Sequence, residues 1–196
     1  MIELRRCETQ GLMWQAPPGE HHHASGEYGG DWRRRGRPEH RTLGVGLRAF
    51  GDGPAAAYAR LQSGDPAAAI VFEGLEPGAE IDADGAVLGG PAGYEVDGFD
   101  PRLGSPADAA VLATAPMPAG YEPWPDDVVD EPGGGGPLRA DMVACRRPEG
   151  GAVFSVGSIA WTGCLAGDDD NPVSRVTANA LAELAREAPF RERPGG

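Results

Sequence analysis

Residues 140–157 read ADMVAC, RRPEGG and AVFSVG, which is two apolar runs joined by a polar segment. Each run has the length of a β-strand, and the proline and paired glycines between them suit a tight connection. We therefore expect a β-hairpin here. It gives the chain a substantial strand content near its C-terminal end.

A helix is expected directly after this hairpin. Asn171 supplies an N-cap and Pro172 a first-turn proline, while Asp168, Asp169 and Asp170 carry negative charge at the positive end of the helix dipole. Apolar side chains then recur at the i, i+3, i+4 spacing of one buried face, at Val173, Val176, Thr177, Ala180, Leu181, Leu184 and Ala185. The helix should end before Pro189.

Toward the N-terminus, the pattern predicts more strands and one short helix. Strands are expected at 42–50, 67–75 and 107–114, with shorter ones near 86–88 and 94–96. A short helix is expected at 54–61, where a proline stands near the first turn. Residues 1–7 alternate apolar and charged side chains, which suits either a truncated domain or an ordinary edge strand.

Glycine and proline are unusually frequent, with 31 and 19 residues among 196, so the fold should be rich in loops. A chain of this length suits one compact unit over 1–196. The strand-like start at residues 1–7 leaves open an interpretation in which this unit is incomplete at its N-terminus. Residues 116–137 are expected to form a flexible loop, in which the GGGG run at 133–136 lacks the residues of a phosphate-binding loop. The expected class is α/β with a C-terminal helix.

The charge and cysteine content exclude several classes of protein. The net charge of −13 would repel nucleic-acid phosphates, and no apolar run approaches the length of a membrane span. Three cysteines far apart do not indicate a disulfide framework. We therefore expect a soluble cytoplasmic protein that binds neither nucleic acid nor a membrane.

Several strings resemble one known family in their order and spacing. They are GEHHHASGEYGGDWRRRG at 19–36, FEGLEPG at 72–78, LGGPAGYEVDGFDPRLGSP at 88–106, GGAVFSVGSIAWTGCL at 150–165 and DDDNPVSRVTANALAEL at 168–184. Together they resemble the C-terminal region of the large, or beta, subunit of the N,N-dimethylformamidase family. The unmatched part is mainly the loop from Met117 to Pro137.

This resemblance implies the C-terminal part of a glutamine-amidotransferase-like domain that hydrolyses small N-alkylated amides. It further implies a mononuclear iron held by tyrosine and glutamate side chains, with the ligands in polypeptide that precedes this region. No His-x-Glu element of such a core occurs in the sequence. We therefore assign no metal ligand, and expect activity only with the upstream core or a neighbouring subunit.

The segment 17–37 holds the densest set of groups that could act on an amide. His22, Glu27 and Tyr28 are the candidate cleft residues, because the GE, HH and GEYGG strings recur as a unit in the resembled family. A surface histidine-rich loop without a ligand is the alternative interpretation. Both remain open.

Other polar residues have weaker functional interpretations. Glu73 suits a paired strand-end carboxylate or a perturbed acid, and Asp126 and Asp127 suit a solvated turn or a supporting role. Cys164 lacks the glycine-flanked frame of a hydrolase nucleophile. The second hypothesis for the whole chain is a non-catalytic module that binds a small molecule or a partner.

Overall fold

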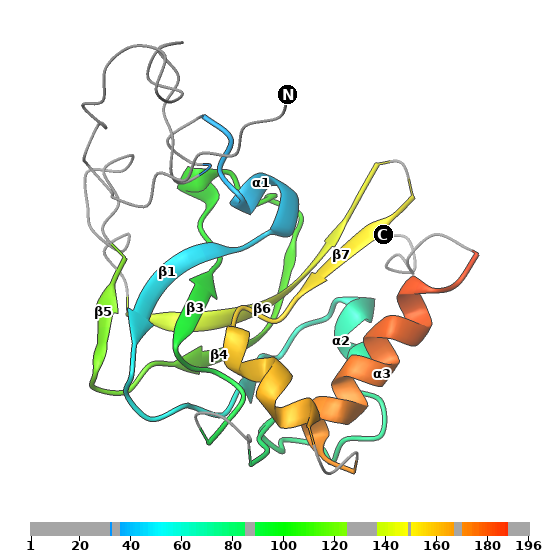
Figure 1. Cartoon of the computed structure of the whole chain (residues 1–196). Helices are drawn as coiled ribbons and strands as arrows, with labels where there is room; N and C mark the ends of the chain where they lie inside the picture. Colours follow the sequence, from blue (N-terminus) through cyan, green and yellow to red (C-terminus); the bar gives the residue numbers. More distant parts are fainter. Residues whose placement is uncertain are drawn as a thin grey trace, which may run out of the picture.

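The computed structural model describes residue 32 and residues 36–84, 89–124, 137–148, 150–166 and 170–187 (Figure 1). The elements in order are α1 (His40–Leu43), β1 (Gly46–Gly51), β2 (Ala59–Arg60), α2 (Pro66–Val71), β3 (Glu95–Gly98), η3 (Pro101–Leu103), β4 (Ala110–Pro116), β5 (Tyr121–Pro123), β6 (Arg139–Arg146), β7 (Ala152–Ser155), η5 (Ile159–Leu165) and α3 (Pro172–Leu184). The η elements are 3₁₀ helices. No helix in the described ranges is long and apolar enough to cross a membrane.

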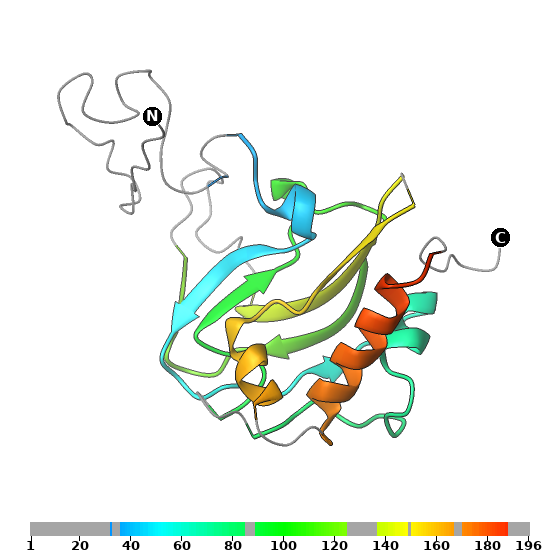
Figure 2. The same cartoon turned by 45° about the vertical axis from the view of Figure 1, so that its right-hand side comes forward.

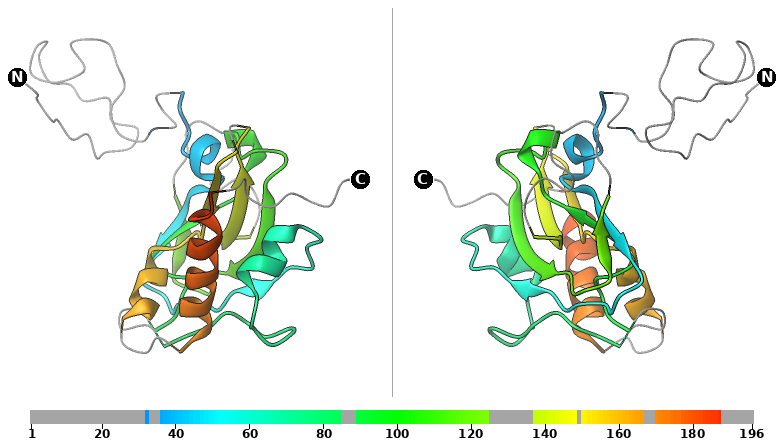
Figure 3. Two further views of the ribbon diagram at one scale, coloured as in Figure 1. Left: turned by 90° about the vertical axis from the view of Figure 1, so that its right-hand side faces the viewer. Right: turned by 90° about the vertical axis from the view of Figure 1, so that its left-hand side faces the viewer.

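Two antiparallel sheets form the framework. One has the strand order β3-β1-β5, and the other has the order β2-β4-β6-β7. Helices α2 and α3 lie on the side of the molecule away from β1, as two turned views show (Figures 2 and 3). The fold therefore mixes helices with sheets as expected, but every strand pair in the described sheets is antiparallel.

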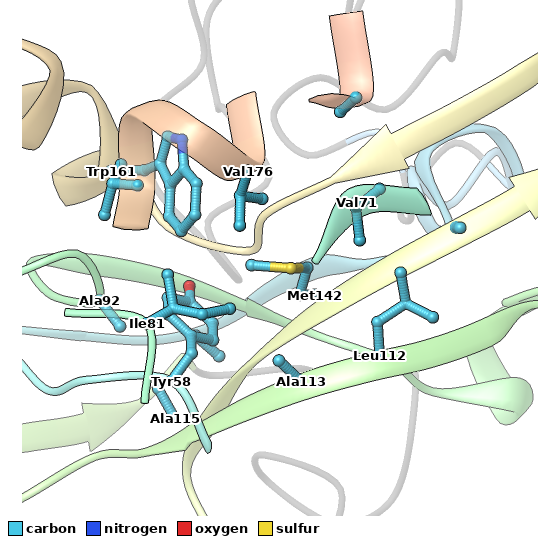
Figure 4. Close-up of a cluster of buried hydrophobic side chains, with 14 of the residues drawn as sticks. Tyr58, Val71, Ile81, Ala92, Leu112, Ala113, Ala115, Met142, Trp161 and Val176 are labelled. Atoms are coloured by element: carbon cyan, nitrogen blue, oxygen red, sulfur yellow. The ribbon is translucent and has the colours of Figure 1, made fainter. Parts of the chain in front are cut away.

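Strand β6 is buried on both faces, so it forms the centre of the molecule. Ala140, Met142 and Ala144 belong to the larger core beneath η5 and α3, whereas Val143 and Cys145 pack in a second cluster with Val45. Figure 4 shows the larger core, with Trp161 and Val176 facing the strands that carry Leu112 and Met142. Residues from both sheets contribute to this core.

The hairpin and the last helix are confirmed. Strands β6 and β7 pair antiparallel, and the connection closes with a hydrogen bond of 2.7 Å from the Arg147 amide to the Gly151 carbonyl. In α3, the Asn171 side chain accepts a hydrogen bond from the Ser174 amide at 2.9 Å. The strands expected at 107–114 and 94–96 are present as β4 and β3, each displaced slightly along the chain.

Two predicted elements are wrong. The apolar run at 67–75 forms helix α2 rather than a strand, because Asp65 caps it by accepting from the Ala67 amide and Pro66 occupies its first turn. The predicted helix at 54–61 is extended instead. Ala56 and Tyr58 form isolated bridges to Ala92 and Ile81, and β2 pairs with β4.

Two boundaries also differ. The strand expected from Thr42 begins only at Gly46, because Thr42 and Leu43 complete α1 and Gly44 ends it with a positive φ of 80°. Strand β5 lies inside the expected loop at 116–137, of which residues 125–136 are outside the described residues. The strands considered at 1–7 and 86–88 also lie outside them.

Candidate functional site

The candidates from the histidine-rich segment, His22, Glu27 and Tyr28, lie outside the described residues, as do Asp126 and Asp127. The structure therefore neither brings them together nor separates them. Glu73 is described, and it lies in an exposed turn after α2 rather than at a strand end.

Tyr94 has an unusual backbone. Its φ is 65°, and within the described ranges no other non-glycine residue has a positive φ. Such a conformation costs on the order of 1–3 kcal/mol and persists where the surroundings hold it, often at functional sites. No local sequence signal marks this position, because aromatic residues rarely adopt a positive φ.

Hydrogen bonds on both sides hold the Tyr94 backbone in place. The Tyr94 amide donates to the Tyr121 hydroxyl at 3.2 Å, and its carbonyl accepts from the Gly51 amide at 2.9 Å. The preceding Gly93 amide donates to the Ser158 hydroxyl at 2.8 Å, which in turn donates to the Gly93 carbonyl at 3.0 Å. The strained residue is thus fixed from three other segments of the chain.

This backbone directs Tyr94 and Glu95 to the outer side of the β3-β1-β5 sheet. Glu95 and Glu122 are the direct cross-strand partners of Phe50, one on each side, so the three side chains share one face. The Phe50 and Tyr94 rings contact edge to face with centroids 4.9 Å apart, and each residue is 40% exposed. We call these four residues, Phe50, Tyr94, Glu95 and Glu122, the open face.

The open face has side chains that could line one wall of a substrate cleft, but these side chains are exposed to water and do not form an enclosed site. Its rings offer an apolar surface to small alkyl groups, and its carboxylates can accept or donate a proton. Both carboxylates are exposed. Carboxylates become effective general acids or bases when an apolar cover removes them from water, so this face requires a second layer of protein to act.

A charge cluster lies between the sheets. The Arg139 Nε donates to Asp141 at 2.7 Å, and Arg102 donates to both carboxylate oxygens of Asp100 at 3.0 and 2.6 Å. Asp141 also accepts from the Phe99 amide and the Thr114 hydroxyl. These donors occupy both carboxylates, so the cluster joins η3, the residue after β3, β4 and β6, and does not supply a general base.

Arg48 enters the cluster from β1 through a β-bulge between Leu47 and Ala49. Its stem passes over Gly98, where a Cβ would lie 2.6 Å from the Arg48 Cδ. Its guanidinium is 4.0 Å from Asp100. Burial and the nearby Arg139 lower the pKa of Arg48 from its ordinary value, which reflects three guanidinium groups facing two carboxylates.

The environments of the two described cysteines disfavour the thiolate form that acts as a nucleophile. Cys145 and Cys164 are buried, and burial raises the pKa of both thiols above the ordinary value. The Cys164 thiol points to the Ala83 carbonyl at 3.5 Å. The sequence-based rejection of Cys164 agrees with this environment.

The donor sets in the described part do not fit the iron centre implied by the resemblance. No group of three or more His, Cys, Asp or Glu residues in these ranges is arranged to hold a metal ion. Tyr58 is fully buried and donates to the Val156 carbonyl at 2.5 Å, and burial raises the pKa of its phenol well above the usual value. Tyr121 donates to the Gly53 carbonyl at 3.2 Å. These tyrosine hydroxyls are bonded to backbone carbonyls and are not grouped with carboxylates as iron ligands would be.

Comparison with known proteins identifies relatives over nearly the whole chain. Residues 2–174 match the family model described as N,N-dimethylformamidase beta subunit-like, C-terminal. The chain is 36% identical over 198 aligned positions to the N,N-dimethylformamidase beta subunit of Paracoccus aminophilus, and 35% identical to that of an Alcaligenes species. Both alignments cover 96% of the chain but only 26% of the relative's length. The chain thus spans about a quarter of the curated relatives that it matches.

Proposed function

Because the chain belongs to the N,N-dimethylformamidase beta subunit-like, C-terminal family, we propose that it is the C-terminal part of an amidohydrolase for small N-alkylated amides. The observation that carries this proposal is the alignment to the Paracoccus subunit over 96% of the chain. The proposal includes a cytoplasmic location and an amidotransferase-like core in the preceding polypeptide. On its own, the chain should not hydrolyse amides.

Amide hydrolysis sets the chemical requirements. Water adds to the carbonyl carbon, the C–N bond breaks, and the amine leaves with a proton while a carboxylate remains. The carbonyl must be polarised and the leaving amine protonated. In this proposal the groups that polarise the carbonyl belong to the preceding polypeptide, where an iron of the kind that the family resemblance implies would be held and would supply Lewis-acid chemistry.

The chain itself would supply one wall of the cleft. Phe50 and Tyr94 would pack against the alkyl groups on the amide nitrogen, and Glu95, which follows the strained Tyr94, would move a proton to the leaving amine. His22, Glu27 and Tyr28 would line or support the same cleft, as the family resemblance implies. Glu80 is an exposed carboxylate outside the open face, so it serves as a matched control.

A replacement experiment tests the function. The C-terminal region of the Paracoccus beta subunit would be replaced by residues 1–196, and turnover of N,N-dimethylformamide would be measured for this chimera and for the chain alone. We expect turnover by the chimera and none by the chain. Turnover by the chain alone would show that its reacting groups are complete. It would contradict the proposal that the preceding polypeptide supplies the groups that polarise the carbonyl.

Substitutions in the chimera test the individual residues. We expect Glu95→Gln to lower kcat by about 10²-fold or more, the usual contribution of a general acid, while Glu80→Gln has little effect. His22→Ala, Glu27→Ala and Tyr28→Ala should each lower turnover. Unchanged rates for all three would remove the histidine-rich segment from the mechanism. A chimera that folds and assembles but shows no turnover would favour the non-catalytic binding module.

A further inference from the structure

The two faces of the β3-β1-β5 sheet have opposite environments. Ala49 and Val96 point from β1 and β3 into the shared core and are fully buried. Phe50, the next residue of β1, points the other way and is 40% exposed. In Figure 1, this sheet lies on the side of the molecule away from α3. No described helix or strand covers the open face.

The exposed rings are not scattered single residues. Phe50 and Tyr94 contact each other, and the backbone of Tyr94 is strained. A contiguous aromatic surface rimmed by polar side chains is typical of an interaction site, since leaving it in water forgoes burial free energy. The hydrogen bonds that hold Tyr94 keep this surface rigid before any partner arrives, which lowers the entropy cost of binding.

A second exposed apolar surface exists on α3, where Leu181 is 62% and Leu184 is 40% exposed. Helix α3 lies on the other side of the molecule from the β3-β1-β5 sheet (Figure 1). The open face differs from it in having two aromatic rings in contact and a strained backbone, so the contact is expected there, and Leu181 is a suitable control position.

The length of the relatives identifies the occupant. They match this chain through a region described as C-terminal, and about three quarters of their length lies outside the alignment. We propose that the open face is the docking surface for the polypeptide that precedes this region in the relatives, carried on the same chain or on a separate one. This inference rests on the proposed function, because the cleft would form where the two parts meet.

The open face also specifies the chemistry of its partner surface. Two aromatic rings require an apolar recess, and the flanking Glu122 favours arginine or lysine at its rim. A second copy of this chain fits poorly, because each copy carries a net charge of −13 and would present the same carboxylates. The preceding polypeptide is thus expected to offer a basic rim around an apolar recess.

Hydroxyl-radical footprinting of the isolated chain and of the Paracoccus chimera tests the docking surface. We expect oxidation of Phe50 and Tyr94 to be several-fold slower in the chimera, while oxidation of Leu181 is unchanged. Equal oxidation of the two rings in both proteins would overturn the proposal. Protection without amide turnover would support docking and refute the proposed activity, whereas turnover without protection would do the reverse.

A second measurement avoids dependence on the chimera. A photo-crosslinking amino acid would be placed at Phe50, with Leu181 as the control position, in the host cell of this protein. We expect position 50 alone to capture a polypeptide that matches the preceding part of the N,N-dimethylformamidase beta subunit. Capture of another copy of this chain, of an unrelated protein, or of nothing would each count against the proposal.

Discussion

Asp100 shows how a single side chain keeps its charge inside this molecule. Its side chain is 8% exposed, and burial alone would raise its pKa. Hydrogen bonds from the Arg102 side chain and amide outweigh burial, so the pKa of Asp100 lies below its ordinary value. Ser105 supports the same turn by accepting from the Asp100 amide at 2.9 Å. The ionised carboxylate therefore stabilises the folded state.

The lowered pKa predicts how stability depends on pH. The stabilisation by Asp100 should be complete above about pH 4, where the unfolded carboxyl is ionised, and should fall as the pH drops through the lower folded pKa. The difference in unfolding free energy between wild type and Asp100→Asn should shrink over that acid range. Urea denaturation at several pH values measures it, with the exposed Asp52→Asn as control. A pH-independent difference would contradict this account.

At the scale of elements, the turn after β7 joins the two sheets. Gly157 has a φ of 72°, and its carbonyl accepts from the Asp97 amide at 2.8 Å. The next residue, Ser158, forms a bridge to Val96 of β3. A Cβ at Gly157 would clash with the Asp141 carbonyl oxygen of β6, so glycine is required for backbone approach as well as for φ.

A pair of glycine substitutions separates these two requirements. Gly78 has a similar φ of 79°, but a Cβ added there would meet nothing within 4 Å, so Gly78→Ala should cost only about 1 kcal/mol of stability. Gly157→Ala should cost about 3 kcal/mol or more, because the backbone atoms it meets cannot move aside without breaking strand contacts. Urea denaturation of both variants measures the loss of unfolding free energy. An equal loss for the two variants would show that the Asp141 backbone can shift away from the added Cβ at little energetic cost.

At the scale of the whole molecule, the two sheets and the helices share one core. Ala49 and Val96 of the smaller sheet belong to the same buried cluster as Leu112 and Met142 of the larger sheet. Trp161 packs edge to face on Tyr58 with centroids 5.8 Å apart and donates to the Thr177 hydroxyl of α3 at 3.0 Å. Neither sheet therefore has an independent core.

This shared core predicts a single unfolding transition. Far-ultraviolet circular dichroism and tryptophan fluorescence should report the same urea midpoint. Met142→Ala, which creates a cavity at a fully buried position, should lower both midpoints together and cost about 2–5 kcal/mol. Leu181→Ala, at a 62% exposed position, should change them little. Two separate transitions would show that the sheets unfold independently.

The elements recognised correctly from sequence are those with local causes. The β6–β7 hairpin follows from turn residues between two apolar runs, and α3 follows from the Asn171 cap and its apolar period. The family relationship followed from ordered strings along the whole chain, and the comparisons confirm it. The candidate cleft residues His22, Glu27 and Tyr28 stay predictions, because they lie outside the described residues.

The remaining features depend on partners distant in sequence. The run from Ala67 to Val71 is an exception, because the local cap at Asp65 and Pro66 starts the helix there and packing beside α3 only accompanies it. Ala59 pairs with Thr114, 55 positions away by number, so local propensity could not reveal β2. The strained Tyr94 backbone is likewise held by hydrogen bonds to Gly51 and Tyr121, and the neighbouring Gly93 is held by a hydrogen bond to Ser158. Local sequence determined where turns and caps lie, whereas tertiary contacts made residues 54–61 extended and built the open face, because only such contacts supply long-range strand pairing and burial energy.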